Sequence, residues 1–316
     1  MAPVIEVQNL KKYFPTPRGL LHAVDDVTFT IEKGKTLGVV GESGCGKSTL
    51  GRTIIHLQES TAGKIFLEGK PVNNLKGKAL REAREDMQII FQDPYSSLDP
   101  RKTAEQTIRE PLQVARKYSK AEIEEKTTAL MELVGIDERL RKAYPHELDG
   151  GRRQRIGIAR ALALDPKFVV CDEPVSALDV SIQAQVLNLL KKLQQDRGLT
   201  YMFVTHDMSV VRHISDDICV MYLGQVVEKC PSKELFKNPL HPYTKALLSA
   251  IPSTDIHHPT KRMILKGEIT SPINPKPGCR FAARCPYATE ACHQPQKQEE
   301  VSTGHFVTCC RIHEIG

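Results

Sequence analysis

The chain has 316 residues, of which 40% are hydrophobic and 26% are charged, values typical of an ordinary globular protein. This length suits about two domains, or one large domain with an appendage. The formal net charge of +6 is mildly basic, and the basic residues are scattered. The charge therefore permits a nucleic acid or an anionic membrane surface as a partner but requires neither.

No apolar run approaches the ~20 residues that are needed to span a bilayer. Residues 1–10 are typical of a strand and lack the pattern of a signal peptide. We therefore expect a cytoplasmic chain, in which the nine cysteines are not expected to form structural disulfides. Five of these cysteines fall between Cys279 and Cys310, and this clustering indicates a common purpose.

From residue 1 to about residue 92, the pattern predicts strands with short turns, including hairpin turns at 32–35 and 68–70. A predicted strand at 35–40 and a predicted helix at 50–57 flank a loop with the pattern G-x-x-x-x-G-K-[ST]. Such a loop turns backbone N–H groups toward a phosphate chain, and the following helix adds a favourable dipole. The alternative is a chance glycine-rich turn.

In this loop, Lys47 is expected to reach the outer phosphates, and Ser48 to offer its hydroxyl to Mg²⁺. The residues expected to bind the nucleotide phosphates are Gly41, Ser43, Gly44, Cys45, Gly46, Lys47, Ser48 and Thr49.

Residues from about 93 to 160 change character, because helical periodicity at 103–116 and 120–134 predicts a helical insertion. Strands at 168–171 and 201–204, with a helix at 181–195 between them, follow the insertion. Apolar strands that alternate with helices favour an α/β core with a buried parallel sheet.

Polar residues follow several of these strands. Asp172 and Glu173 end one strand, where Asp172 is a candidate Mg²⁺ ligand and Glu173 a candidate for polarising water. Gln92 and His206 end two others, and Tyr13 is a candidate for stacking on a base. Each of the last three alone would more often be structural: a capping amide, a core histidine and a half-buried aromatic ring.

From about residue 238, prolines interrupt regular structure around a short predicted helix at 243–250. A tract with little apolar surface follows, and it would need a cross-link such as a bound metal to fold stably. Cysteines 279, 285, 292 and 309 are separated by five, six and sixteen residues, and either a zinc ion or an iron–sulfur cluster accepts four thiolates. The spacing lacks the short Cys pairs of structural zinc sites, and free thiols are the remaining alternative.

The segment 148–155 (LDGGRRQR) is similar to the signature segment of ATP-binding cassette (ABC) ATPases. The order of motifs also resembles that family: Tyr13, the phosphate loop, Gln92, the signature, Asp172–Glu173, the segment 176–179 and His206. The resemblance covers about residues 3–250. It implies an α/β P-loop ABC ATPase with a RecA-like core, an antiparallel β subdomain and a helical subdomain.

This resemblance implies a head-to-tail dimer that sandwiches ATP and Mg²⁺ between one chain's phosphate loop and the other chain's signature. In the signature, Asp149, Gly150 and Gly151 would contact the nucleotide. Implied roles elsewhere are Glu173 as the catalytic base, His206 on the γ-phosphate, Gln92 at the metal and Asp179 in a loop that communicates across the dimer.

The segments 92–100 and 235–244 and the cysteine tail look like those of ATPase subunits of dipeptide and oligopeptide importers. The expected organisation is a cassette at 1–237, with its helical subdomain at about 93–160, and a small irregular cysteine-rich region at 238–316. The resemblance implies a second ATPase, two membrane subunits and an extracytoplasmic binding protein as partners, with no nucleic acid. It also implies a peripheral location on the inner face of the membrane.

In this family, a similar tail carries a [4Fe–4S] cluster, which implies Cys279, Cys285, Cys292 and Cys309 as ligands. Zinc stays open as the alternative metal, and Cys310 as the alternative fourth ligand. The cluster's role, structural or redox, also stays open. The cargo is not specified by an energy subunit, so dipeptides, oligopeptides, nickel chelates and oligosaccharides all remain possible.

The signature departs from the usual L-S-G-G-Q, because Asp149 replaces the serine and Arg152 the glutamine. An ionised carboxylate cannot donate a hydrogen bond to a phosphate, and it repels one. We therefore expect a heterodimer in which the site that uses Asp149 is impaired, the alternative being that both sites work. Two other function classes are an ABC ATPase acting on nucleic acid or ribosomes and an iron–sulfur sensor with a vestigial ATPase.

Overall fold

The computed structural model describes residues 3–251, 262–265, 267 and 270–315. The chain divides into two compact units. Unit 1 comprises residues 1–4, 32–34 and 74–202, and unit 2 comprises residues 5–31, 35–73 and 203–316. Within the described ranges, no helix combines the length and the apolar character that crossing a lipid bilayer requires.

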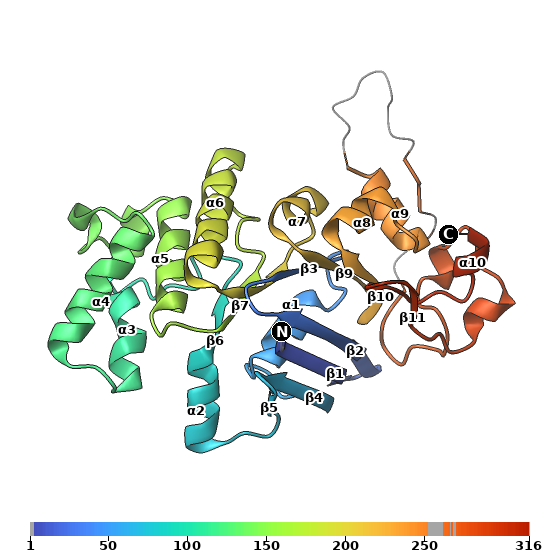
Figure 1. The fold of residues 1–316 in the computed structure, drawn as a ribbon, viewed down its shortest axis with the longest axis horizontal. Coiled ribbons are helices and arrows are strands. Elements are labelled where there is room, and N and C mark those ends of the chain that lie inside the picture. The colour runs from blue at the N-terminus through green and yellow to red at the C-terminus, as the bar shows by residue number, and fades with distance from the viewer. Residues whose placement is uncertain (1–2, 252–261, 266, 268–269, 316) are drawn as a thin grey trace. The chain divides into compact units, whose positions relative to one another are not determined.

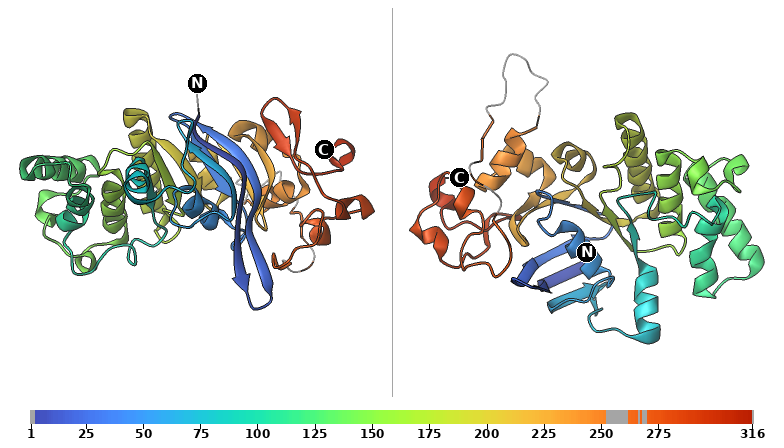
Figure 2. Two further views of the ribbon diagram at one scale, coloured as in Figure 1. Left: turned by 90° about the horizontal axis from the view of Figure 1, so that it is seen from below. Right: turned by 180° about the vertical axis from the view of Figure 1, so that it is seen from behind.

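Unit 2 contains an antiparallel sheet in the order β2-β1-β4-β5. Its long hairpin joins β1 (Pro3–Thr16) to β2 (Gly19–Glu32), drawn in blue in Figure 2. The short hairpin of β4 (Ala62–Leu67) and β5 (Lys70–Pro71) turns at residues 68–69, which confirms the turn predicted there.

A second set of strands in unit 2 has the order β11-β12-β10-β9-β3. The central pair, β3 (Thr36–Val40) and β9 (Asp217–Tyr222), is parallel, and all five residues of β3 are buried. The hairpin predicted at 32–35 is therefore wrong. The glycine turn redirects the chain into a different sheet, so that β3 pairs with a strand about 180 residues away in sequence instead of with β2.

Unit 2 also holds helices α1 (Lys47–Ile54), α7 (Met208–Ile214), α8 (Ser232–Lys237) and α9 (Pro242–Ser249). Helix α1 begins three residues before the predicted start, because the phosphate-loop lysine already has helical geometry. Strand β8 (Thr200–Val204) crosses the division between the units at residue 202.

The C-terminal region is less irregular than its prolines predict. Strand β12 (His305–Val307) pairs with β10 (Gln225–Pro231), and β11 (Glu299–Ser302) pairs with β12. Short helical turns at Ala282–Arg284 and Glu290–His293 and the helix α10 (Ile312–Ile315) complete the described part. Residues 252–261 of the predicted region lie outside the described residues.

A buried carboxylate of β10 forms hydrogen bonds with this region. Glu228 is fully buried and accepts N–H groups of Leu240 and His241 at 2.8 and 3.0 Å. His305 Nε2 lies 2.8 Å from the same carboxylate. Burial lowers the pKa of His241 to about 4, although the charge of Glu228 acts in the opposite direction. His241 is therefore neutral at pH 7, and its Nδ1 accepts the N–H of Tyr243 at the start of α9.

Unit 1 pairs β6 (Met87–Ile90) with β7 (Phe168–Asp172) in parallel. The helices predicted at 103–116 and 120–134 are confirmed as α3 (Ala104–Ala115) and α4 (Lys120–Leu133), and both pack on α5 (Gly150–Leu162) (Figure 1). Capping boxes at Thr103 and Ser119 fix the starts of the first two. Helices α2 (Gly77–Asp86) and α6 (Val180–Arg197) and short turns at Glu138–Leu140 and Pro145–Glu147 complete the unit.

Candidate functional site

The phosphate loop lies in unit 2 between β3 and α1, where the pattern placed it. Its Gly46 has φ = 104°, and a Cβ there would lie 1.9 Å from the carbonyl oxygen of Ala23, so only glycine fits. Lys47 is 5% exposed, and its Nζ donates to the carbonyls of Gly41 and Glu42 at 2.8 and 3.0 Å. An ammonium group held on carbonyl oxygens at a helix N-terminus is well placed to meet an anion.

The rest of the loop has the exposure that ligand binding requires. Ser43 and Gly44 are exposed, whereas Ser48 and Thr49 are partly exposed in the first turn of α1. Cys45 is buried, and burial raises the pKa of its thiol, so it remains a protonated packing residue. Successive backbone N–H groups of this loop can therefore surround a phosphate chain.

Tyr13, the candidate for stacking on a base, lies in β1 and is partly exposed. One face of its ring stacks on His22, with ring centroids 3.9 Å apart and an interplanar angle of 20°. Its hydroxyl donates to Asp25, and burial followed by this hydrogen bond raises the pKa of Tyr13. The ring is thus held by its neighbours in unit 2 before any ligand binds.

The two carboxylates predicted at the end of β7 lie in unit 1. Asp172 is fully buried at the end of the strand, and Glu173 is partly exposed immediately after it. Glu173 has φ = 47°, a left-handed conformation that is costly for a glutamate and that clusters at functional sites. Gln92 Nε2 donates to Glu173 Oε2 at 3.1 Å, so the structure brings two of the predicted catalytic residues together.

The signature also lies in unit 1, at the start of α5. Asp149 caps this helix, because its Oδ1 accepts the N–H of Arg152 at 2.7 Å. The guanidinium of Arg152 lies 3.2 Å from the other carboxylate oxygen. Gly151 is buried against α6, since a Cβ there would lie 2.6 Å from the Ile182 methyl group. Gly150, which precedes it, is partly exposed.

Arg153 has a different partner from its neighbour. Its Nε donates to the carbonyl of Pro145 at 2.6 Å, and its guanidinium lies 4.7 Å from the ring centroid of Tyr95. Only Arg152, therefore, directly offsets the charge of Asp149. Two further candidates are exposed: Asp179, which precedes α6 in unit 1, and His206, which follows β8 in unit 2.

The tail cysteines gather around one cavity in unit 2. Its lining includes Cys279, Cys285, Cys292, Cys309 and Cys310. Cys309 is partly buried and Cys310 is exposed, but the Sγ of Cys310 lies 4.0 Å from that of Cys292. The geometry thus leaves both as candidate fourth ligands. Burial raises the pKa of Cys279 to about 12, so a bound cation would have to supply the charge that stabilises its thiolate.

The spacing of these sulfurs is a test of which metal fits. Zinc–sulfur bonds of about 2.3 Å in a tetrahedron place the sulfurs about 3.8 Å apart. Within the described residues, no three tail thiols lie within 4.8 Å of one another. The donor set fits a metal group held by thiolates. Cys292 and Cys310, at 4.0 Å, lie near the zinc spacing, but no third described tail thiol lies within 4.8 Å of both.

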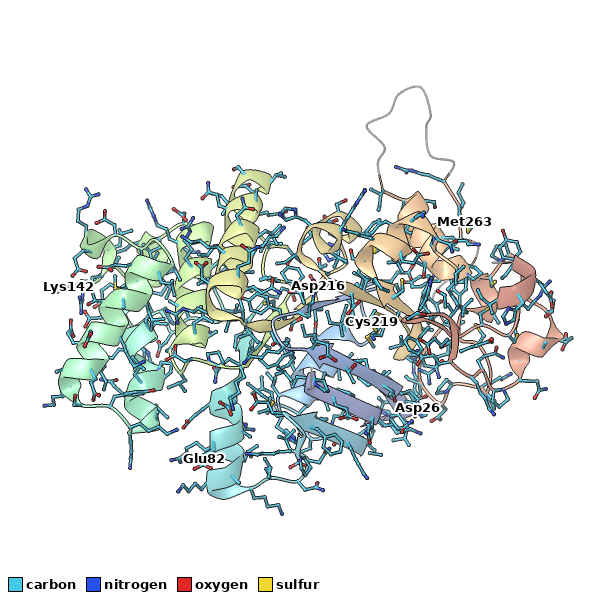
Figure 3. All side chains as sticks on the ribbon, in the orientation of Figure 1. Asp26, Glu82, Lys142, Asp216, Cys219 and Met263 are labelled. Atoms are coloured by element: carbon cyan, nitrogen blue, oxygen red, sulfur yellow. The ribbon has the colours of Figure 1, made fainter. Side chains whose placement is uncertain are left out.

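The one group of potential metal ligands that does converge this closely, within the described part of the chain, is Glu228, Cys230 and His305. No sequence pattern indicates this group, because Glu228 and Cys230 lie in β10 and His305 lies in β12, and the pairing of these strands has no local signal. Both oxygens of Glu228 already accept hydrogen bonds, so its role is the structural one described above. The four remaining cysteines, including Cys219 of β9 (Figure 3), are buried.

A phosphate loop, a strand that ends in Asp-Glu, a nearby glutamine and a glycine-rich segment that opens a helix define the class of ATP-binding cassettes. A family model described as "ABC transporter" matches residues 24–176, and one described as "Oligopeptide/dipeptide transporter, C-terminal region" matches residues 227–292. The first matches the loop-bearing core and the second begins in β10 and extends to Cys292.

Curated relatives cover nearly the whole chain. The oligopeptide transport ATP-binding protein AppF of Bacillus subtilis is 50% identical over 317 residues, covering 97% of this chain and 96% of the relative. OppF of Salmonella typhimurium, also an oligopeptide transport ATP-binding protein, is 50% identical, with 97% and 93% covered. DppF of Haemophilus influenzae, a dipeptide transport ATP-binding protein, is 49% identical, with 98% and 97% covered.

Among solved structures, the dimeric cassette MJ0796 of a bacterial ABC transporter has a TM-score of 0.66 and 30% identity, covering 72% of this chain and 98% of that one. A dimeric post-hydrolysis state of the same cassette, bound to ADP and Pi, gives the same TM-score. The chain belongs to the family of ATP-binding proteins of oligopeptide and dipeptide ABC transporters. These proteins are ATPases coupled to transport, so the cofactors of this chain are ATP and Mg²⁺.

Proposed function

We propose that this chain hydrolyses ATP at its own phosphate loop to drive the import of peptides through a membrane complex. The observation that carries the proposal is the position of Lys47, whose ammonium group rests on two loop carbonyls at the N-terminus of α1. An incoming phosphate chain would compete for this group and gain the loop's N–H groups as well. Calorimetric titration of the full chain with Mg·ATP tests this step.

Each predicted residue has a distinct role in this proposal. The loop residues 41 and 43–49 bind the phosphates, and Tyr13 stacks on adenine. Ser48, Gln92 and Asp172 supply the oxygen ligands that Mg²⁺ prefers. Glu173 orients or deprotonates the attacking water, and His206 contacts the γ-phosphate. The close approach of Gln92 to Glu173 supports the assignment of these two to one reaction centre.

We place the boundary of the cassette near residue 237, with the helical subdomain at about 93–160 and the C-terminal region at 238–316. The proposed partners are a second ATPase, two permease subunits and an extracytoplasmic binding protein, with the chain on the inner face of the membrane. The names of the curated relatives favour peptides over nickel chelates or oligosaccharides as cargo. Calorimetry on the cognate binding protein with di- and oligopeptides tests the cargo.

In the proposed dimer, Asp149, Gly150 and Gly151 face the nucleotide of the other ATPase, and Asp179 lies in the loop that contacts it. Asp149 would bring a carboxylate toward the γ-phosphate, where two unit charges ~4 Å apart repel by about 4 kcal/mol at an effective dielectric constant of 20. Arg152, 3.2 Å away, offsets part of this repulsion. We infer a heterodimer in which this second site is impaired.

Replacing Asp149 with serine should raise ATP turnover per assembled transporter by a few-fold, roughly two- to tenfold. Serine removes the repulsion of about 4 kcal/mol, of which Arg152 already offsets a part, and still caps α5. Turnover is measured on the purified complex with both ATPases. Asp196→Ser, at an exposed position in α6, is the matched control. Unchanged turnover in Asp149→Ser would mean that the aspartate is tolerated and that both sites work.

We propose that the tail holds a [4Fe–4S] cluster on Cys279, Cys285, Cys292 and Cys309, with zinc and Cys310 as the alternatives. The convergence of five cysteines on one cavity supports a metal group there. Because no three of the described tail thiols lie within 4.8 Å of one another, we favour the larger cluster over a single zinc ion. Such a group would cross-link a region that has little apolar core of its own.

The cluster proposal predicts a brown protein after anaerobic purification, with about four iron atoms per chain. Cys285→Ser should lower the iron content and bleach the visible absorption, because one of four thiolate ligands is lost. Cys219→Ala, which changes a buried core cysteine, should keep both. A colourless protein with one zinc ion per chain would contradict the cluster.

A further inference from the structure

Two arginines of the cysteine tail reach the candidate nucleotide site within unit 2. Arg280 follows Cys279 directly, and Arg284 directly precedes Cys285. Their side chains are only 6% and 9% exposed, so both make their contacts inside the protein. Each contacts a different end of the site.

Arg280 contacts the part of the site that contains Tyr13. Its Nη2 donates to the carboxylate of Asp25, and its Nη1 donates to the carbonyl of Leu223. The same carboxylate accepts the hydroxyl of Tyr13 and lies 3.2 Å from Nδ1 of His22, the ring on which Tyr13 stacks. Asp25 is therefore a hub that fixes both rings, and Arg280 is its buried counter-ion.

A turn beside Arg280 joins this hub to the phosphate loop. Gly224 accepts the N–H of Asp25 at 2.8 Å and donates its own N–H to the carbonyl of Cys45 at 2.8 Å. A Cβ at Gly224 would lie 2.5 Å from the carbonyl oxygen of His22, so the approach leaves no room for a side chain. Moving Arg280 would thus disturb the aromatic pair through Asp25 and the turn through Leu223.

Arg284 contacts the phosphate end. Its two terminal nitrogens bind the two carboxylate oxygens of Glu42 at 2.7 and 3.0 Å, a bidentate pair. Glu42 is the second residue of the phosphate loop; its carbonyl holds Lys47, and its N–H donates to the hydroxyl of Tyr243. The rings of Tyr222, Tyr243 and Phe281 pack on one another, and the guanidinium of Arg284 lies over the ring of Tyr222.

We propose that Arg280 and Arg284 are positioning residues for ATP and that the cysteine tail is thereby a structural part of the nucleotide site. Arg280 sets the ring of Tyr13 for the adenine base through Asp25. Arg284 sets the backbone of the phosphate loop through Glu42. The inference rests on the proposed roles of Tyr13 and of the phosphate loop.

The two arginines differ in which part of the nucleotide should be affected. We expect Arg280→Met to weaken Mg·ATP binding about tenfold, because base–aromatic stacking is lost, and to leave the binding of inorganic triphosphate within twofold. We expect Arg284→Met to weaken both ligands by a similar factor, about fivefold, because both use the phosphate loop. Arg280→Lys, which keeps a charge for Asp25, should recover part of the ATP affinity.

The measurement is isothermal titration calorimetry on the full chain with each ligand, with the melting temperature recorded for every variant. Arg18→Met, at an exposed position in the turn between β1 and β2, is the matched control. Asp25→Asn breaks the same hub from the other side and keeps the shape of the side chain. It should reproduce the loss of ATP affinity even if Arg280→Met folds poorly.

A double mutant separates positioning from docking of the tail. In a Tyr13→Ala background, adding Arg280→Met should change ATP affinity by less than twofold, since the ring through which it acts is gone. If Arg280→Met and Asp25→Asn weaken ATP and triphosphate equally, or weaken neither, the inference is overturned while the proposed function stands. If the wild-type chain binds neither ligand, the proposed function itself has failed.

Discussion

Replacing Lys47 with methionine should lower the affinity of the chain for Mg·ATP at least about 100-fold. The ammonium group of Lys47 is buried and donates to two carbonyls of the phosphate loop, at 2.8 and 3.0 Å. Charge-assisted hydrogen bonds contribute roughly 1.5–3 kcal/mol each, and at least two to the outer phosphates would be lost. Methionine keeps most of the length of the side chain and is a good helix former, so α1 should still form.

Calorimetry on the full chain measures this loss. Lys64→Met, an exposed lysine in β4 of the same unit, is the control and should bind ATP as the wild type does. If Lys47→Met bound ATP within threefold of the wild type and with the same heat, the nucleotide would have to bind elsewhere.

Replacing Glu173 with glutamine should lower ATP turnover of the assembled transporter about 1,000-fold and leave ATP binding unchanged. A positioned general base contributes about 10²–10⁴-fold to a rate, and glutamine cannot accept the proton of water. Glutamine keeps the shape and can still meet the amide of Gln92, which lies 3.1 Å from the carboxylate. The defect should therefore appear in kcat, with little change in KM.

Phosphate release from the purified complex, measured under multiple turnover, shows the effect. Glu125→Gln, an exposed position in α4, serves as the matched control. Full turnover in Glu173→Gln would assign the activation of water to another residue. If ATP binding fell by the same factor as turnover, Glu173 would contribute to the binding of ATP and not to the chemical step.

The sequence predicts the local chemistry of the site well, because each motif is a continuous segment. The left-handed Gly46, the helix after it and the buried strand before Asp172 all depend on neighbours within a few residues. The capped helices of unit 1 are predictable for the same reason, since Thr103 and Ser119 stand directly before helical periodicity.

The failures concern pairing between distant segments. The glycine turn at 32–35 has the composition of a hairpin, but composition does not say which strand is the partner. Helix α2 was missed because Ala83 is its one buried residue among those described, so it has almost no apolar stripe to detect. The order within the C-terminal region was missed because β12 pairs with β10, a strand about 80 residues earlier in the chain.

The arginine contacts were beyond prediction for a related reason. Arg280 lies 255 residues from Asp25, and Arg284 lies 242 residues from Glu42. The only local signal is that each arginine stands next to a cysteine of the tail, which by itself suggests a metal site. Their partners become visible only once the tail is folded against the β1–β2 hairpin and the loop of the same unit.

The most direct test of the whole account is ATP-driven uptake of a labelled oligopeptide by vesicles that contain the complete transporter and its binding protein. Uptake is expected with the wild-type chain, and none above background is expected with Glu173→Gln, although the variant chain assembles and retains ATP. Uptake at the wild-type rate with Glu173→Gln, or the absence of peptide uptake by a wild-type complex that hydrolyses ATP, would contradict it.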